Sequence, residues 1–230
     1  MKYPGTELEL FRHAANWKRR WATAVRPFVQ GHVLEVGCGL GANAHHVCHD
    51  RVLSYTFLEP DAHLLAQVPE HAHLPPNTAQ RSVQGTSRDM AGERFDAVLY
   101  IDVLEHIEDD TAELQRAYDM LNPGGHLIIL VPAFQFLYSP FDEAIGHHRR
   151  YDRPLLRARM PAGLRIHRLR YLDSAGFLLS LGNKLMLRSA APTRAQVLFW
   201  DRWIVPLSRI TDPLVAHAFG RSLLAVAQKP

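Results

Sequence analysis

Three glycines spaced two residues apart follow a short apolar run that ends in a carboxylate. The run is Val33-Leu34-Glu35-Val36, and the glycines are Gly37, Gly39 and Gly41. Because glycine lacks a Cβ, it permits a tight strand-to-helix turn and lets a ligand lie against bare backbone. The spacing predicts a turn that cradles a nucleotide or nucleoside, followed by a helix over residues 41–49.

Two acidic residues decide between the ligands that use such a turn. The glycines also fit the dinucleotide pattern G-x-G-x-x-G/A, but the carboxylate of Glu35 would repel a pyrophosphate. S-adenosylmethionine (SAM) carries an α-amino group and a sulfonium, which suit an acidic neighbour. Glu59 ends the next predicted strand (53–59), about 20 positions after the first glycine, where a carboxylate accepts hydrogen bonds from both ribose hydroxyls.

The glycine stretch resembles motif I of the class I SAM-dependent methyltransferases, acidic-x-G-x-G-x-G, at every fixed position. Two later stretches resemble the same family: Ile101-Asp102-Val103-Leu104-Glu105-His106-Ile107 after a strand predicted at 95–100, and Leu121-Asn122-Pro123-Gly124-Gly125 before a buried strand at 126–132. The resemblance covers residues 33–132. It implies an α/β fold with a Rossmann-like seven-stranded sheet, an antiparallel last strand and helices on both faces.

The resemblance also implies SAM as cofactor and S-adenosylhomocysteine (SAH) as product. The residue that contacts adenine stays open, because Gly85, Thr86 and Ser87 stand where the family usually has an acidic residue and Asp89 comes slightly later. The cofactor-binding residues predicted on this basis are Glu35, Gly37, Cys38, Gly39, Gly41, Asn43, Glu59, Pro60, Gly85, Thr86, Ile101, Asp102, Val103 and His106.

A second stretch with reactive side chains is Gly146-His147-His148-Arg149-Arg150-Tyr151. It resembles a G-H-x-R-R-Y element of one bacterial branch of the family, the type 11/12-like methyltransferases. An oxygen nucleophile needs its proton removed, and histidine is the natural base near pH 7. We predict catalytic roles for His147 first, then His106 and His148, with Tyr151 as a polar partner.

The acceptor is expected to lie over the carboxyl edge of the sheet. Two arginines suit a carboxylate or phosphate through forked hydrogen bonds; alternatively, they tie their loop to Asp142, Glu143 or helix ends. The tryptophans near residue 20 either face the ligands or simply pack in the core. The predicted substrate-binding residues are Trp17, Trp21, Phe134, Tyr138, His147, Arg149, Arg150, Tyr151 and Trp200.

The remaining elements must position these residues within a single domain spanning 1–230. We expect lid helices over 7–28, a SAM-binding core at 32–132, an acceptor and cap region at 133–220 and a final strand at 221–228. A helix at 111–121 is predicted to stop at Gly124 and Gly125, and a strand is predicted at 165–171. The apolar cap between the last two strands could form an acceptor pocket, a dimer interface or a surface that touches lipid, and these alternatives stay open.

Composition narrows the partners. The net charge of +3 without a clustered basic patch gives no reason to expect nucleic acid. No apolar run is long enough for an integral membrane segment, so we expect a cytoplasmic protein, with peripheral membrane contact left open. The 14 histidines lack zinc-ligand spacing and are expected at the surface, so no metal is predicted. The oligomeric state is predicted as monomer or homodimer.

The sequence therefore predicts a SAM-dependent methyltransferase of a small-molecule acceptor, with O-methylation of an acidic or amphiphilic biosynthetic intermediate favoured. The alternatives are an N- or C-methyltransferase of a natural-product intermediate and a non-catalytic SAM-fold binding or scaffold protein. A nucleic-acid amino-methyltransferase is disfavoured because D/N-P-P-Y/F/W does not follow the fourth strand. An NAD oxidoreductase is disfavoured by Glu35.

Overall fold

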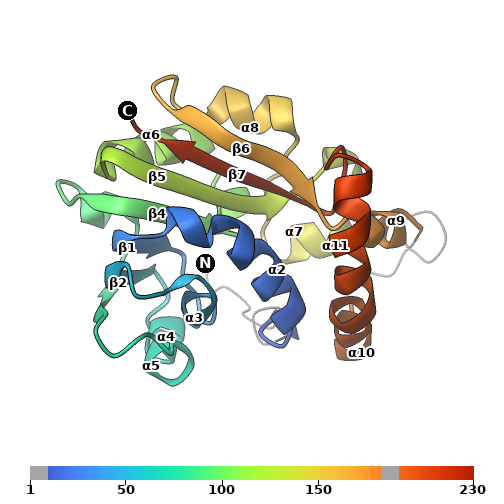
Figure 1. The fold of residues 1–230 in the computed structure, drawn as a ribbon, viewed down its shortest axis with the longest axis horizontal. Helices are drawn as coiled ribbons and strands as arrows, with labels where there is room; N and C mark the ends of the chain where they lie inside the picture. The colour runs from blue at the N-terminus through green and yellow to red at the C-terminus, as the bar shows by residue number, and fades with distance from the viewer. Residues whose placement is uncertain (1–9, 183–191) are drawn as a thin grey trace.

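A seven-stranded sheet forms the centre of the computed structural model, which describes residues 10–182 and 192–230 (Figure 1). The strand order is β3-β2-β1-β4-β5-β7-β6, and β7 runs antiparallel to both of its neighbours. The predicted fold class is confirmed. The strands are β1 (Gly31–Val36), β2 (Val52–Glu59), β3 (Ala79–Gln84), β4 (Phe95–Ile101), β5 (Leu121–Pro132), β6 (Arg165–Leu172) and β7 (Ser222–Gln228).

The central strands are buried on both faces, as their nearly continuous apolar runs require. Side chains alternate between two core clusters: Val33 and Leu99 pack on one face of the sheet, while Leu34 and Val98 pack on the other. This alternation fixes which helices cover which face.

Helices cover both faces of the sheet. The first core cluster includes residues of α2 (Ala15–Val25), α3 (Ala44–Val47) and the cap, and the second includes residues of α6 (Asp110–Met120) and α8 (Arg153–Arg159). The other described helices are α4 (Ala62–Leu65), α5 (Val68–His71), α7 (Pro140–Ala144), α9 (Ser174–Gly182), α10 (Arg194–Phe199) and α11 (Val205–Leu214), with a π turn, η6 (Trp200–Ile204), between the last two.

The cap and the N-terminal helix lie side by side although they are far apart in the sequence (Figure 1). Asp201 of the π turn accepts hydrogen bonds from the N–H groups of Asn16 (3.1 Å) and Trp17 (2.8 Å) at the start of α2. Asp212 of α11, fully buried, pairs with Arg20 (3.0 Å). These two carboxylates fasten α2 to the cap.

Several predicted boundaries are wrong. The helix expected over 41–49 is a single turn, α3, because the chain from Gly37 to Asn43 stays in a turn. Gly124 and Gly125 do not end α6, since Leu121 already takes an extended conformation and pairs with Phe95 as the first residue of β5. Of the helices expected over 7–28, the described part contains α2 and a 3₁₀ turn at Arg26–Phe28, and residues 7–9 lie outside the described residues.

Side-chain hydrogen bonds fix two further local features. Asp61 caps α4, because its side chain accepts from the N–H groups of His63 and Leu64. His49 was expected at the surface, but it is 8% exposed and its Nε2 lies 3.1 Å from the carbonyl oxygen of Arg26.

Within residues 10–182 and 192–230, no helix has the length and apolar character needed to span a bilayer.

Candidate active site

The glycine turn follows β1 in a conformation that favours glycine. Gly37, Gly39 and Gly41 have φ values of +65°, +54° and +72°. A Cβ on Gly37 would lie 2.7 Å from the side chain of Val103. The stretch that follows β4 therefore packs directly on the first glycine, and the two motifs predicted to bind the cofactor are in contact.

Glu35 lies beneath this turn with its carboxylate almost completely buried. It accepts hydrogen bonds from Asn43 Nδ2 and from the Tyr55 hydroxyl, both at 3.0 Å. Burial raises the pKa of Glu35, while the two hydrogen bonds and the charge of Lys18 oppose that rise. Lys18 Nζ lies 3.1 Å from Asn43 Oδ1, so one cation already shares this site.

Glu59 ends β2 beside the same turn. Its carboxylate accepts from the N–H groups of Gly39 (2.9 Å) and Asp61 (3.1 Å), and burial raises its pKa. Each carboxylate oxygen keeps a second lone pair for a ligand hydroxyl. Buried carboxylates beside glycine N–H groups match the donor and acceptor needs of a cationic nucleoside, so the residues present fit SAM.

Non-glycine residues with positive φ follow the carboxyl ends of β4, β5 and β6. Asp102 (φ +55°) follows β4, Phe134 (+63°) follows β5 and Asp173 (+68°) follows β6. Such strained residues cluster at ligand sites. The Asp102 side chain reaches solvent but is closely surrounded by protein. The resulting desolvation raises its pKa to about 6, although the charges of His147, Arg221 and Lys18 lower it.

His147 is held by a buried carboxylate. Its Nδ1 lies 2.9 Å from Asp142 Oδ1, and Arg150 binds both oxygens of Asp142 at 2.9 Å. Burial alone would raise the pKa of Asp142, but the hydrogen bonds from His147 and Arg150 outweigh it and hold that pKa well below its usual range. With Nδ1 directed at Asp142, the imidazole presents its Nε2 away from that carboxylate.

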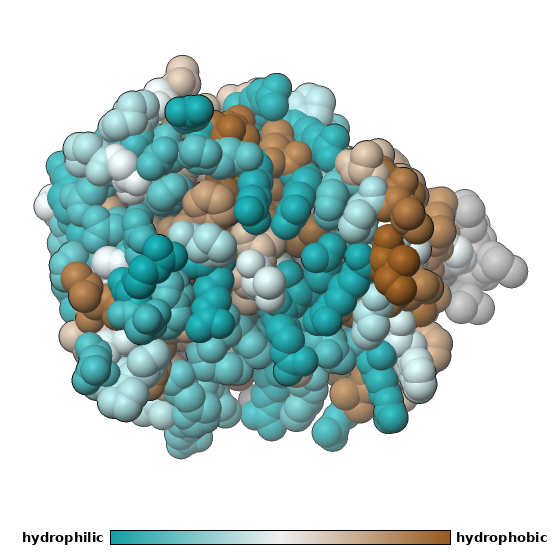
Figure 2. Space-filling model, viewed as in Figure 1, coloured by the Kyte–Doolittle hydropathy of each residue, from teal (hydrophilic) through white to brown (hydrophobic). Residues whose placement is uncertain are grey.

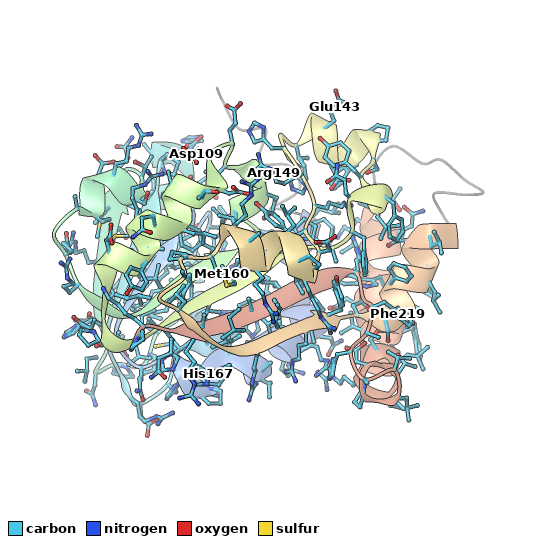
Figure 3. The ribbon with its side chains drawn as sticks, turned by 90° about the horizontal axis from the view of Figure 1, so that it is seen from above. Asp109, Glu143, Arg149, Met160, His167 and Phe219 are labelled. Carbon is cyan, nitrogen blue, oxygen red and sulfur yellow. The ribbon has the colours of Figure 1, made fainter. Side chains whose placement is uncertain are left out.

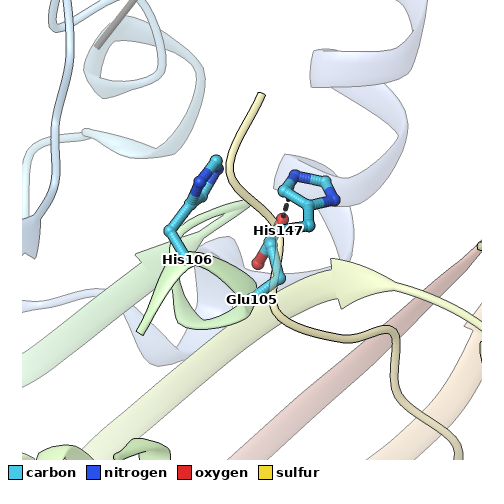
Figure 4. A group of neighbouring side chains, drawn as sticks. All are labelled: Glu105, His106 and His147. Carbon is cyan, nitrogen blue, oxygen red and sulfur yellow. Dashed lines mark ion pairs between the residues drawn. The ribbon is translucent and has the colours of Figure 1, made fainter. Parts of the chain in front are cut away.

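That Nε2 faces Glu105, as Figure 4 shows. The Nε2 to Oε1 distance is 3.8 Å, and the His106 ring lies 4.6 Å from the His147 ring. Glu105 is 1% exposed, and its Oε2 has no hydrogen-bond partner among the described residues. Burial, followed by the negative charge of Asp102, raises the pKa of Glu105 well above its ordinary value.

The same three side chains could hold a divalent cation. One ligand atom from each of Glu105, His106 and His147 lies within 4.8 Å of the others. Imidazole nitrogens and carboxylate oxygens are ligands of Zn²⁺, and a carboxylate behind a histidine orients metal ligands and general bases alike. The geometry suits both roles, and the absence of a metal remains a prediction.

Comparison with known proteins supports the family that the site indicates. Residues 34–127 match a family model described as a methyltransferase domain. This match, which covers less than half of the chain, supports a class I SAM-dependent methyltransferase. The match takes in the glycine turn, Glu59 and the stretch after β4.

Curated relatives of this methyltransferase are similar over part of their length. The ubiquinone biosynthesis O-methyltransferase of Azorhizobium caulinodans is 31% identical over 110 residues, which are 47% of this chain and 43% of that protein. The chain thus spans less than half the length of this relative.

Solved structures share the fold over nearly the whole chain. The protein solved in complex with the Trm112 methyltransferase activator of Haloferax volcanii has a TM-score of 0.61 at 15% identity, covering 94% of this chain and 91% of that one. The N-methyltransferase NodS of Bradyrhizobium japonicum, solved with SAH, has a TM-score of 0.59 at 13% identity, covering 95% and 88%.

Arg149 and Arg150 both bind groups of the protein itself, which is the alternative to binding the acceptor. Arg149 donates to the carbonyl oxygens of Ile107 and Glu108 and to Asp110, beside the start of α6, where Figure 3 labels Asp109. Arg150 pairs with Asp142, as described above. Tyr151 is fully buried and donates to Asp110 (2.8 Å). These three residues position the loop that carries His147.

The other residues predicted to bind the acceptor fall into two groups. Trp17, Trp21 and Trp200 are buried in the core, and Trp200 Nε1 donates to Asp173 (2.8 Å). Phe134 and Tyr138 lie near the site. The Tyr138 hydroxyl donates to the His147 carbonyl oxygen (2.6 Å), and Phe134 stacks on an aromatic side chain of β6.

The remaining predicted cofactor residues line the turn and its neighbours. Cys38 is buried, and burial raises the pKa of its thiol, so it is no thiolate nucleophile. Asp89 accepts from the N–H and hydroxyl of Thr86, which fixes the turn after Gly85. Pro60 and His148 are exposed.

A separate surface hollow bordered by Gly31 lies at the amino ends of the strands, away from the candidate active site.

Four residues near the site have no role predicted from the sequence. Lys18 shares one helix face with Ala14, Trp21 and Val25. A lysine within an apolar stripe could have been predicted to lie at a buried site. Asp142 and Glu105 stand inside the stretches singled out, without an assigned role. Arg221, which precedes β7, lies 4.7 Å above the Trp200 ring, and no local pattern marks it.

Proposed function

We propose that this methyltransferase transfers the methyl group of SAM to a hydroxyl oxygen of an acidic or amphiphilic small molecule. The observation that carries the proposal is His147, oriented by Asp142 and close enough to Asp102 for their charges to interact. A histidine held in this way can take the proton of a hydroxyl. The name of the Azorhizobium relative, an O-methyltransferase, supports oxygen as the attacked atom.

Each part of the site has a task in this reaction. SAM, when bound, supplies the methyl group and the leaving thioether. Glu59 would accept hydrogen bonds from the ribose hydroxyls of SAM, and Glu35 would lie on the side of its α-amino group. His147 Nε2 takes the proton of the acceptor hydroxyl, while Asp142 stabilises the resulting imidazolium. Holding the acceptor in line provides much of the rate, since proximity and orientation can supply several kcal/mol (roughly 7–11) of the barrier.

An anionic acceptor group has a counterpart in Arg221. Burial lowers the pKa of this guanidinium, and the carboxylates of Asp173 and Asp102 oppose the change. Arg149 and Arg150 are bound to protein carboxylates, so Arg221 replaces them in the proposal as the cation that meets the acceptor. An apolar part of the acceptor would contact Phe134.

Titration calorimetry with SAM, SAH and NAD is the first test. We expect micromolar binding of SAM and SAH and no binding of NAD. Glu59→Ala should lose SAM binding, whereas Glu70→Ala, at an exposed position of α5, should keep it. Transfer of labelled methyl to a panel of hydroxylated, aminated and carbon acids would then identify the acceptor.

Two outcomes would contradict the proposal. A folded protein that binds neither SAM nor SAH would favour the scaffold alternative. Transfer only to nitrogen or carbon acceptors would keep the methyltransferase and remove the oxygen assignment.

A further inference from the structure

The continuous helix formed by α10, the π turn and α11 has an apolar outer stripe. Phe199, Trp203, Leu207, Ile210 and Leu214 are separated by four, four, three and four residues, so they share one side of the helix. Between 47% and 79% of the surface of each is exposed. We call these five residues the cap face.

Neighbouring residues extend this apolar area. Leu178 and Leu179 of α9 are 58% and 47% exposed, and α9 and α11 pack against each other. Figure 2 shows hydrophobic side chains gathered at the end of the molecule where α9 and α11 lie. Contiguous exposed apolar patches of this kind mark interaction surfaces.

In the α10–α11 helix the negatively charged side chains are buried and the positively charged ones are exposed. The two carboxylates of the helix formed by α10, the π turn and α11 are Asp201 and Asp212, which are 6% and 0% exposed and accept from α2. The arginines Arg194, Arg202 and Arg209 are exposed. The outer surface of the helix therefore combines apolar side chains with positive charge only.

We infer that the cap face docks the protein on an anionic lipid bilayer. A helix that presents an apolar stripe with arginines along one border lies in the plane of a membrane interface, with the apolar side chains among the acyl chains and the cations at the anionic headgroups. Arg202 lies over the Trp203 ring (5.3 Å), which places an aromatic ring and a cation together at the depth where both are favourable.

A second copy of the chain fits this surface less well. In a two-fold dimer the same patch meets itself, so the exposed arginines next to the stripe would meet a second positively charged surface without acidic partners. An anionic bilayer satisfies the same apolar surface and neutralises the arginines. The sign of the exposed charges thus favours lipid.

Docking at this surface would bring lipid close to the candidate site. Phe177 of α9 contacts Phe134 (5.4 Å) and Phe219 (5.2 Å), the latter labelled in Figure 3 at the cap end of the molecule. These aromatic side chains connect the cap with the end of β5. That an amphiphilic acceptor uses this route rests on the proposed function, whereas the docking itself does not.

Tryptophan fluorescence provides a built-in probe. Trp17, Trp21 and Trp200 are at most 8% exposed, whereas Trp203 is 60% exposed. Vesicles of phosphatidylcholine with phosphatidylglycerol should shift the emission to shorter wavelength, and brominated lipids should quench it. Vesicles of phosphatidylcholine alone should have little effect, and Trp203→Phe should remove the response.

Vesicle flotation with matched variants completes the test. Ile210→Glu should lower partitioning into anionic vesicles at least tenfold, whereas Leu53→Glu, at a 59% exposed leucine of β2, should leave it unchanged. SAM affinity, measured on both variants, should equal that of the wild type and so verify the fold independently of docking.

Either of two results overturns the inference. Wild-type protein that fails to float with anionic vesicles shows that the cap face is no lipid surface. A concentration-dependent dimer in sedimentation velocity, abolished by Ile210→Glu but not by Leu53→Glu, together with no flotation, assigns the surface to a second copy.

Discussion

The orientation of the His147 imidazole depends on Asp142, and this makes the pair the most informative residues to change. His147→Ala should lower kcat by about 100-fold to 10,000-fold, the range that removal of a general base produces, with SAM affinity unchanged. Asp142→Asn should lower kcat less while disturbing the loop. Rates are compared with His63→Ala, whose side chain is exposed on α4. A His147→Ala enzyme with a normal rate would remove the base assignment.

We predict that Asp102 couples cofactor binding to pH. Its pKa is raised to about 6 by desolvation, so the carboxylate is ionised at pH 7 and becomes protonated as the pH falls through 6. SAM affinity, which the ionised form favours through charge, should decrease over that range, and Asp102→Asn should flatten the profile. Calorimetry between pH 5 and pH 8 measures this (a range chosen to bracket the pKa), and an unchanged profile in Asp102→Asn would exclude Asp102 as the cause.

The same shift has the opposite consequence for stability. A carboxyl whose folded pKa lies above its unfolded value costs stability once the pH exceeds the unfolded pKa. Asp102→Asn should therefore raise the melting temperature at pH 7, and asparagine also tolerates the positive φ of this position. Gain of stability with loss of SAM affinity would identify a residue kept for binding.

Chelation distinguishes the two roles open to the Glu105, His106 and His147 cluster. If His147 acts as base, incubation with EDTA followed by gel filtration should leave the rate unchanged. Activity that disappears with EDTA and returns with Zn²⁺ or Mn²⁺ would show that the cluster holds a metal, and His147 would then be a ligand rather than the base.

Residue types and spacing predicted part of this site and missed another part. The glycine turn and Glu35 form a local pattern that suits SAM, and His147 stands in the family-like stretch 146–151. Lys18 and Arg221 reach the site only through tertiary contacts across α2 and β7. The partners of Arg149 lie about 40 residues away in the chain, a pairing that spacing does not encode.

At the scale of elements, α2 depends on a cap supplied by another helix. Ala14 offers no side-chain acceptor at the start of α2, and Asp201 accepts the two N–H groups instead. Asp201→Ala should lower the free energy of unfolding by about 2 kcal/mol, near the upper end for a lost cap. It should also weaken SAM binding, because α2 carries Lys18 to the turn.

Asp109→Ala is the matched control for this effect. Asp109 caps α6 through the N–H of Ala112 (3.0 Å) on the other face of the sheet. It should cost a similar free energy of unfolding, measured by urea denaturation, with SAM affinity retained. Equal loss of SAM affinity in both variants would mean that general destabilisation, rather than α2, is responsible.

Strands were easier to predict than helix ends for a physical reason. Inner strands such as β4 and β7 are apolar runs buried by the sheet, so their hydrophobicity alone marks them, whereas the edge strand β3 is polar and exposed. Helix ends depend on capping and on competition with neighbouring strands. Gly124 illustrates the limit: its positive φ was foreseen as a helix stop, but the chain had already entered β5 at Leu121.

At the scale of the whole molecule, the contacts connect the cofactor turn with the cap through one helix. Lys18 joins α2 to Asn43, while Asp201 and Asp212 join α2 to the cap helix. A ligand that orders the turn should therefore order segments far from it in sequence. Hydrogen exchange read by mass spectrometry should show slower exchange over 15–25 and 194–214 when SAH is added.

Peptides from β6 and β7 and the Asp201→Ala variant are the controls for the hydrogen-exchange experiment. Peptides from β6 and β7, which pack away from the turn, should exchange equally with and without SAH. In Asp201→Ala, SAH at saturating concentration should still protect the glycine turn but no longer the cap, because the connection through α2 is cut. Protection of the cap that persists in this variant would mean that the ligand contacts the cap directly, and the acceptor side of the site would then extend to α10.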